Sequence, residues 1–176
     1  AELMLDKGYS IQGSDISVND NTKRLKKKGI KFFLGHNKKN IKYADAVVYS
    51  SAIKKNNPEI KEAYIKKIPV LSRADMLSEL MKNKKSIAIA GSHGKTTTTS
   101  LVGNIFNEAG LDPTIVNGGI INSFSNNNRY GKGEWMIVEA DESDGTFLKL
   151  PHQISIITNL DIEHMDFYKS KKNLIN

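Results

Sequence analysis

The most informative stretch of this sequence is Ser86-Ile87-Ala88-Ile89-Ala90-Gly91-Ser92-His93-Gly94-Lys95-Thr96-Thr97-Thr98-Thr99. A short apolar run leads into a loop that contains two glycines, and a segment with helical apolar spacing follows. Strand, loop and helix in this order are the layout of a phosphate-binding loop. Glycine lets the loop N–H groups turn toward a phosphate, and the helix N-terminus adds further donors. We therefore expect nucleotide phosphates to bind to the residues Gly91, Ser92, His93, Gly94, Lys95, Thr96 and Thr97.

Two side chains of this loop carry the expected chemistry. Lys95 can reach the outer phosphates of a nucleotide, and the Thr96 hydroxyl can bind the accompanying magnesium ion. The commonest form of the motif has a glycine five residues before Gly94, where this chain has Ile89. Gly-Lys-Thr alone is a weak signal in a lysine-rich chain, so the prediction depends on the flanking strand and helix. The alternative is an ordinary strand-to-helix turn with an exposed lysine.

A second apolar run, Trp135-Met136-Ile137-Val138, is followed by the acidic residues Glu139, Asp141, Glu142 and Asp144. Four apolar residues in a row suit a buried parallel strand. Ligand sites of parallel sheets lie at the carboxyl ends of the strands, so we expect these acids to face the phosphate loop. Carboxylate oxygens are ligands that magnesium prefers, which predicts a metal site there. The alternative is a solvated acidic turn.

A third apolar strand pattern, at 153–158, leads into a polar segment that contains His164. This histidine could ligate a metal through a neutral imidazole nitrogen, because it follows the carboxyl end of a predicted strand. A histidine in such a place is more often a hydrogen-bonded structural residue, and both interpretations stay open at this point.

Strand and helix patterns alternate along the whole chain, which predicts an α/β fold with parallel sheets. The predicted strands are 9–15, 31–35, 44–50, 86–90, 114–116, 135–140 and 153–158. The predicted helices are 22–28, 58–66, 73–81, 95–109 and one that begins near Lys169, with an irregular Gly- and Asn-rich loop at 117–133. The polar break Lys82-Asn83-Lys84-Lys85 predicts two domains, 1–82 and 83–176.

Composition limits the class of protein. The 176 residues include no cysteine, which excludes a disulfide framework and thiolate metal sites. We see no apolar run that could span a bilayer and no signal peptide, so we expect a cytoplasmic protein without membrane insertion. The chain begins at Ala1 and ends inside a helical pattern, and we expect it to be part of a longer protein.

The net charge of +7 does not predict a nucleic-acid partner. Only three of the 26 basic residues are arginine, and the lysines gather in runs typical of solvated surfaces. Arginine is the residue preferred for bidentate contacts to bases and phosphates. We therefore expect no nucleic-acid binding, and at most a mild attraction of anionic metabolites.

Several motifs, in the same order, resemble those of the Mur ligases, which build the peptide stem of bacterial peptidoglycan. They are the loop 91–99, whose family form also lacks the upstream glycine, and the segments Gly13-Ser14-Asp15, Gly35-His36, Asn57-Pro58-Glu59, Asn117-Gly118-Gly119, 138–144 and 158–166. The resemblance implies a Rossmann-like UDP-sugar domain followed by a P-loop-type ATPase domain with a parallel sheet, both incomplete.

The resemblance also implies an activity and a set of site residues. It implies an ATP-dependent ligase that joins L-alanine to UDP-N-acetylmuramate through an acyl phosphate. The implied catalytic residues are Lys95, Glu142 and His164, and the implied Mg²⁺ ligands are Thr96, Glu142 and His164. Asp15 and Asn117 are implied to lie near the substrate.

Three other functions stay open at the level of sequence. The sister ligase that recycles murein tripeptide shares these motifs, although Ser143 is more typical of the alanine-adding enzymes. A P-loop NTPase that works as a motor or switch would not need the first domain. A non-catalytic nucleotide-binding module would leave the acids and the histidine at the strand ends unexplained.

Overall fold

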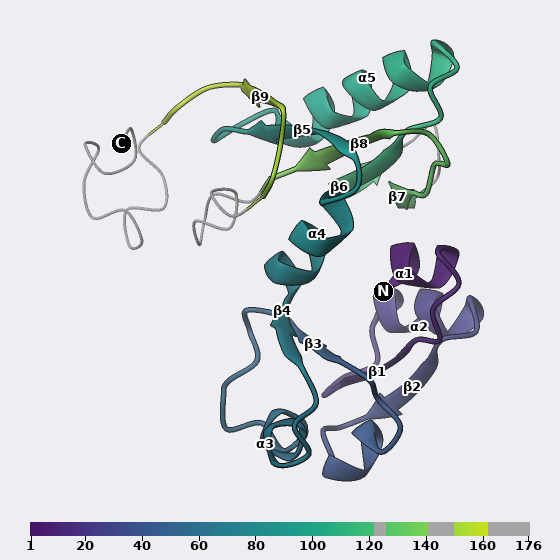
Figure 1. Ribbon diagram of the computed structural model, residues 1–176, viewed down its shortest axis with the longest axis vertical. Helices are drawn as coiled ribbons and strands as arrows, with labels where there is room; N and C mark the ends of the chain where they lie inside the picture. Colours follow the sequence, from purple (N-terminus) through teal and green to yellow (C-terminus); the bar gives the residue numbers. More distant parts are fainter. Residues whose placement is uncertain (122–125, 141–149, 162–176) are drawn as a thin grey trace. The chain divides into compact units, whose positions relative to one another are not determined.

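The computed structural model describes residues 1–121, 126–140 and 150–161 (Figure 1). The chain divides into two compact units, Ala1–Met76 and Leu77–Asn176. The division falls inside helix α4 (Arg73–Met81). The domain boundary between 82 and 83 stays a prediction.

The first unit contains short parallel strand pairs connected by helices. Strand β1 (Gln12–Asp15) pairs with β2 (Lys31–Leu34), and β3 (Val47–Tyr49) pairs with β4 (Val70–Ser72), both in parallel. The connecting elements are α1 (Glu2–Asp6), α2 (Asp20–Lys27), the 3-10 helix η1 (Lys38–Ile41) and α3 (Pro58–Ile65). The sequence did not predict α1, η1 or β4, each of which is too short to show a clear period.

Local side-chain chemistry sets the helix starts in this unit. Asn19 and Thr22 form a capping box, so α2 begins at Asp20, two residues before the predicted start. Asn57 caps α3 by accepting a hydrogen bond from Glu59 N, which was not predicted from the sequence. The helix begins at Pro58, as predicted.

A buried carboxylate, Glu59, ties three parts of the first unit together. Its side chain accepts hydrogen bonds from Ser14 Oγ at 2.7 Å and from Asn40 Nδ2 at 2.6 Å. The backbone N–H of Asn37 donates to it at 3.3 Å, and His36 Nδ1 lies 3.4 Å away. Glu59 is 9% exposed, so these partners replace the water that the carboxylate loses on folding.

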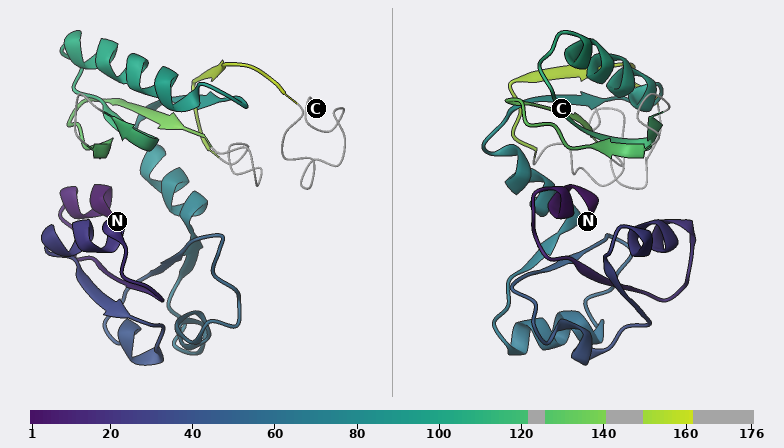
Figure 2. Two further views of the ribbon diagram at one scale, coloured as in Figure 1. Left: turned by 180° about the vertical axis from the view of Figure 1, so that it is seen from behind. Right: turned by 90° about the vertical axis from the view of Figure 1, so that its right-hand side faces the viewer.

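The second unit is a sheet with a long helix against it. Its described strands are β5 (Lys85–Ala90), β6 (Thr114–Ile121), β7 (Asn126–Arg129), β8 (Trp135–Glu139) and β9 (Ile154–Ile157). Among the described residues their order is β7-β6-β8-β5-β9, parallel throughout except for β7 against β6. Helix α5 (Lys95–Glu108) runs along one face of this sheet (Figure 2).

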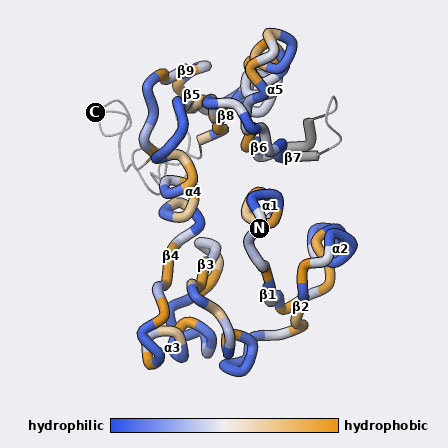
Figure 3. Tube along the Cα trace, turned by 45° about the vertical axis from the view of Figure 1, so that its right-hand side comes forward, coloured by the Kyte–Doolittle hydropathy of each residue, from blue (hydrophilic) through white to orange (hydrophobic). Residues whose placement is uncertain are grey.

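Apolar side chains cover both faces of this sheet. Val102 and Phe106 of α5 pack against a buried cluster of Ile87, Ile89 and Ile137. A second cluster, formed by Met81, Met136, Val138, Ala140 and Leu150, receives Leu77 and Leu80. Both α4 and α5 alternate hydrophobic and hydrophilic stretches in Figure 3, as expected for helices with one face on a core. The prediction of an α/β fold with parallel sheets is confirmed.

The prediction of an irregular loop at 117–133 was wrong for much of its length. Strand β6 continues to Ile121, and β7 pairs with it in an antiparallel direction, with a shift in register between Val116 and Ile121. Glycine and asparagine have low strand propensity, so local sequence gave no strand signal here. The pairing of the two segments supplies the backbone hydrogen bonds that propensity does not predict.

Asp112 closes the base of this hairpin. Its carboxylate accepts a hydrogen bond from the Lys132 backbone N–H at 2.8 Å and one from Arg129 Nη2 at 2.6 Å. These two donors, the backbone N–H first, hold the pKa of Asp112 below its usual range.

The remaining predicted strands and helices that the structure describes are present, with ends that differ by a few residues. The first strand begins at Gln12 rather than at position 9, because Tyr9 N closes the α1 turn on Met4 O. The helix predicted near Lys169 lies outside the described residues. Within the described ranges, we find no helix with the length and apolarity needed to cross a membrane.

Candidate active site

The predicted phosphate loop connects β5 to α5. Gly91 and Gly94 both have positive φ angles, +128° and +81°, which explains why glycine occupies these positions. Gly94 is the N-cap of α5 and carries no side chain that could cap the helix. No N-cap side chain therefore accepts a hydrogen bond from the first N–H groups of α5. N–H groups at a helix N-terminus can donate hydrogen bonds to a bound anion.

Lys95 is the first residue of α5, and its side chain lies back over the loop. Its Nζ donates hydrogen bonds to the carbonyl oxygens of Gly91 at 2.5 Å and Ser92 at 3.2 Å. The side chain is half-buried, which differs from the exposed lysine of the alternative interpretation. An ammonium group held at the loop carbonyls is close enough to move to a phosphate that the loop binds.

Thr96 lies directly beside the acidic end of β8. Its hydroxyl is 3.0 and 3.1 Å from the two carboxylate oxygens of Glu139, and Gly118 N donates to the same carboxylate at 2.6 Å. The parallel pairing of β5 with β8 sets Ile89 opposite Glu139, which brings the end of β8 to the loop. The expectation that the strand-end acids face the phosphate loop is confirmed for Glu139.

The Thr96–Glu139 pair has the chemistry of a magnesium site. A hydroxyl and a carboxylate are hard oxygen donors, and magnesium in nucleotide sites takes one or two protein ligands, with phosphate and water oxygens completing the shell. Within the described ranges, no group of three or more His, Cys, Asp or Glu side chains gathers, so a cage built only from protein is not seen there. The described donors therefore fit Mg²⁺ that is bound together with a nucleotide.

Two of the predicted site residues cannot be placed. Glu142 and His164 lie outside the described residues, together with Asp141 and Asp144, and their assignments stay predictions. Sequence reasoning had not singled out Glu139 as a ligand, although it is the first polar residue after the buried run of β8. Its place at the carboxyl end of that strand was the signal that could have identified it.

Asn117 lies behind Thr96 and is only 6% exposed. Its Nδ2 donates to the backbone oxygen of Thr96 at 3.2 Å and to Ser100 Oγ at 2.8 Å. Its Oδ1 is buried and has no hydrogen-bond partner among the described residues. These contacts support the first turn of α5, and the substrate role of Asn117 stays a prediction.

Asp15, the other predicted substrate residue, ends β1 in the first unit. It is half-buried, and its Oδ1 accepts a hydrogen bond from Ser17 N at 3.1 Å. Its substrate role also stays a prediction.

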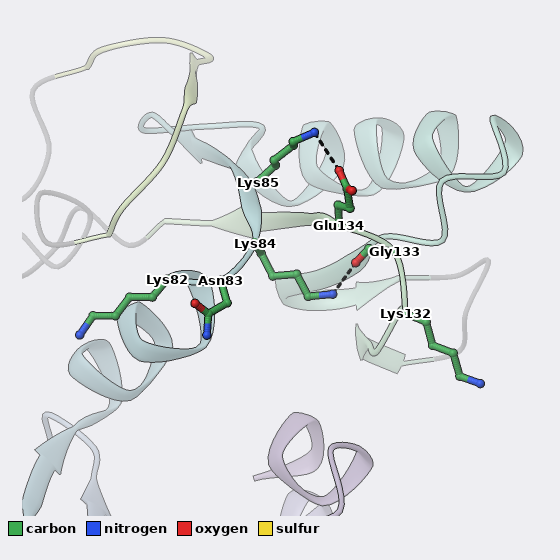
Figure 4. Close-up of a pocket in the computed structure, with 7 residues that line it drawn as sticks. All are labelled: Lys82, Asn83, Lys84, Lys85, Lys132, Gly133 and Glu134. Carbon is green, nitrogen blue, oxygen red and sulfur yellow. Dashed lines mark hydrogen bonds and ion pairs between the residues drawn. The ribbon is translucent and has the colours of Figure 1, made fainter.

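A lysine-lined hollow of about 540 Å³ lies at the other end of β5 (Figure 4). Its lining residues are Lys82, Asn83, Lys84, Lys85, Lys132, Gly133 and Glu134. Lys84 donates to the carbonyl oxygen of Gly133, and Lys85 pairs with Glu134 at 2.8 Å. Because the phosphate loop follows the carboxyl end of β5, this hollow is separate from the candidate site.

Comparison with known proteins gives the same assignment for both halves of the chain. Residues 1–85 match the description "Mur ligase family, catalytic domain", and residues 89–176 match the Mur ligase middle domain. The UDP-N-acetylmuramate--L-alanine ligases of Azorhizobium caulinodans and Rickettsia bellii are 56% and 57% identical to it. These matches cover 97% and 100% of this chain, which spans only 36% and 37% of the length of those relatives.

Solved structures agree with these matches. The UDP-N-acetylmuramate-alanine ligase of Thermotoga maritima has a TM-score of 0.87 and 31% identity, covering 97% of this chain and 40% of that one. A UDP-N-acetylmuramate:L-alanyl-gamma-D-glutamyl-meso-diaminopimelate ligase from Neisseria meningitides, at 23% identity, shares the fold with a TM-score of 0.83, over 96% of this chain and 58% of that one. With its phosphate loop, its parallel sheet and two consecutive domain matches that together cover almost every residue, the chain belongs to the Mur ligase family.

Proposed function

We propose that this chain provides the ATP-binding part, and part of the UDP-sugar-binding part, of a ligase that joins L-alanine to UDP-N-acetylmuramate in peptidoglycan precursor synthesis. The substrates are supported by the relatives of that name, which are 55–57% identical over nearly the whole chain. The ATP-dependent step is supported by one observation above all, the Thr96 hydroxyl beside the Glu139 carboxylate at the phosphate loop.

The reaction has two steps. The carboxylate of the UDP-sugar attacks the γ-phosphorus of ATP, which gives an acyl phosphate and releases ADP. The amine of L-alanine then attacks the acyl carbon, an amide bond forms, and phosphate leaves. Phosphoryl transfer of this kind depends mostly on positioning and on neutralising charge, which are the tasks of the residues around the loop.

The residues in and around the loop have different tasks in the phosphoryl-transfer step. The N–H groups of Ser92 and His93 donate to Asn159. The other loop N–H groups and the N-terminus of α5 therefore hold the phosphates. The Lys95 ammonium moves from the carbonyl oxygens of Gly91 and Ser92 to the outer phosphates, where it offsets their negative charge. Asn117 keeps Thr96 in place through the backbone of α5.

Thr96 and Glu139 are the described residues that would hold Mg²⁺, and Glu142 and His164 remain predicted ligands. The ion, when bound, neutralises charge on the phosphates and on the attacking carboxylate. Asp15, in the first unit, is proposed to lie near the uridine end of the UDP-sugar. A cytoplasmic location is part of the proposal, because the reaction consumes ATP.

The test compares two glutamates of the second unit in the complete ligase that contains this chain. Glu139→Gln removes the charge beside Thr96, whereas Glu134→Gln removes an exposed charge that pairs with Lys85. We expect the magnesium concentration for half-maximal phosphate release to rise at least about tenfold for Glu139→Gln, a scale typical of perturbed metal sites. Glu134→Gln should leave it unchanged. Equal requirements in the two variants would contradict the proposed metal site.

Two further variants separate the loop from the predicted ligands. Lys95→Ala should abolish ATP turnover while the thermal melt stays close to that of the wild type, because the hydrogen bonds described for its ammonium go to loop carbonyls rather than to the core. Glu142→Ala in the magnesium titration tests the assignment that was based on sequence. Normal turnover by Lys95→Ala would remove the phosphate-loop assignment.

The choice of amine is tested by competition. The ratio of specificity constants for L-alanine and murein tripeptide should favour L-alanine. A preference for the tripeptide would make the protein a recycling ligase and would leave the ATP site and the acyl-phosphate step as proposed.

A further inference from the structure

Asn159, in the segment that follows β9, forms hydrogen bonds to the phosphate loop. Asn159 Oδ1 accepts from the backbone N–H of His93 at 2.8 Å, and Asn159 Nδ2 donates to the carbonyl oxygen of His93 at 2.9 Å. One carboxamide thus satisfies both backbone polar groups of a single loop residue. The backbone oxygen of Asn159 also accepts from Ser92 N at 3.2 Å, which extends the pairing of β5 with β9 into the loop.

Thr158 adds to the same contact. Its hydroxyl lies 2.6 Å from the carbonyl oxygen of His93 and 3.3 Å from that of Ala90. The fit is close at Gly91, where a Cβ atom would lie well inside the van der Waals contact distance to Thr158 Oγ1 and 2.9 Å from the Asn159 carbonyl oxygen. The loop and the Thr158–Asn159 pair are therefore complementary in shape as well as in hydrogen bonding.

These contacts hold the backbone at an exposed part of the loop. The side chain of His93 is exposed, so burial in a core does not fix the backbone at this position. A loop that binds phosphate through its N–H groups works best when those groups are already oriented, because reorienting them would use part of the binding free energy. Asn159 and Thr158 orient the backbone on both sides of His93.

We propose that Thr158 and Asn159 are positioning residues of the ATP site, which hold the phosphate loop in its binding shape without contacting the reacting atoms. The proposal rests on the proposed function of the loop as an ATP site. The main support for this role comes from the hydrogen bonds that Thr158 and Asn159 donate to the His93 carbonyl oxygen. A carbonyl oxygen cannot donate to a phosphate, so these bonds affect the conformation of the loop and do not compete with the phosphate. If Asn159 only competed with phosphate for a loop donor, the bond that its Oδ1 accepts from His93 N would be sufficient.

The experiment measures ATP binding by calorimetry, together with thermal melts, in the complete ligase that contains this chain. Asn159→Ala should bind ATP about tenfold more weakly, the scale expected for losing one or two ordinary hydrogen bonds. Thr158→Val should weaken binding in the same direction, whereas Thr158→Ser, which keeps the hydroxyl, should bind like the wild type. Asn159→Asp provides a second test, because it keeps the acceptor but loses the donor to the His93 carbonyl; it should also bind ATP more weakly than the wild type.

Gln153→Ala is the matched control. Gln153 Oε1 accepts from Ser86 N at 2.5 Å, so this carboxamide also bridges β9 and β5, but at the end of the strands opposite to the loop. Its loss should affect the melt as much as Asn159→Ala does and leave ATP affinity unchanged.

The outcomes separate this proposal from the proposed function. If the wild type binds ATP and Asn159→Ala binds it equally well, the positioning role is overturned while the ATP site stands. Tighter binding by Asn159→Ala would also overturn it, because the carboxamide would then be a competitor of the phosphate. A wild type that does not bind ATP would overturn both proposals.

Discussion

Replacing Gly91 by alanine tests the geometry of the phosphate loop most directly. The φ angle of Gly91 is +128°, in a region that is nearly restricted to glycine. The new methyl group would overlap the Thr158 hydroxyl and would lie 2.9 and 3.0 Å from the backbone O and N of Asn159. The backbone atoms cannot swing away as a flexible side chain could, so the sheet end and the loop must separate.

The size of the effect follows from two terms. Backbone strain at this φ angle costs about 1–3 kcal/mol, and forcing an extra carbon into a packed contact costs about 1–3 kcal/mol more. Gly94→Ala is the matched control, because Gly94 also has a positive φ angle, +81°, but a Cβ there meets no atom within 4 Å. Only the strain term applies to it, about 1–2 kcal/mol. Gly91→Ala should therefore cost about 1–3 kcal/mol more than Gly94→Ala.

The assay is denaturant unfolding followed by the fluorescence of Trp135, the only tryptophan of the sequence. Trp135 lies in β8 against the ring of Phe106, so its signal reports on the second unit. Adding Thr158→Ala to Gly91→Ala removes one of the three close contacts and should recover part of the lost free energy of unfolding. Equal losses for Gly91→Ala and Gly94→Ala, together with no recovery in the double variant, would refute the reasoning.

Three further predictions concern packing and charge. Gly103→Ala should destabilise the second unit by about 1–2 kcal/mol in the same assay, because its methyl group would lie 2.6 Å from Cδ1 of the fully buried Ile115; a stabilisation of about 1 kcal/mol would mean that helix propensity dominates. The pKa of Asp112 is lowered in the folded state, so its contribution to stability is present above the unfolded value of 3.8 and is lost as the pH falls through the lower folded value. Asp112→Asn should therefore lose less stability than the wild type between about pH 6 and about pH 3, and identical losses would contradict this. Glu59→Ala should speed hydrogen exchange across 35–41 and cost about 2–4 kcal/mol, because it removes the hydrogen bonds that Ser14, Asn37 and Asn40 donate to this carboxylate. Glu62→Ala on the same helix, whose partner is Lys66, should change little.

Local sequence patterns were sufficient for the order of strand, loop and helix around Lys95 and Thr96. Strand, glycine-containing loop and helix are local patterns, because apolar period, turn residues and caps depend on neighbours within a few positions. Lys95 and Thr96 could therefore be placed at the start of a helix from the local pattern, and α5 begins at Lys95 as predicted. The alternation of strands and helices was sufficient for the α/β class.

Which distant residues meet the loop depends on the order of the strands in the sheet. Glu139 and Asn159 are 43 and 66 residues away from their partners in the loop, and they reach it because β8 and β9 flank β5 in the sheet. The sequence shows only that polar residues follow strand ends, and it does not say which strands are neighbours. The hairpin of β6 and β7 was missed for the same reason, because the pairing that stabilises its glycines and asparagines is not encoded in their own propensities. Strand order depends on long-range burial and pairing, which act between segments that are far apart in the chain.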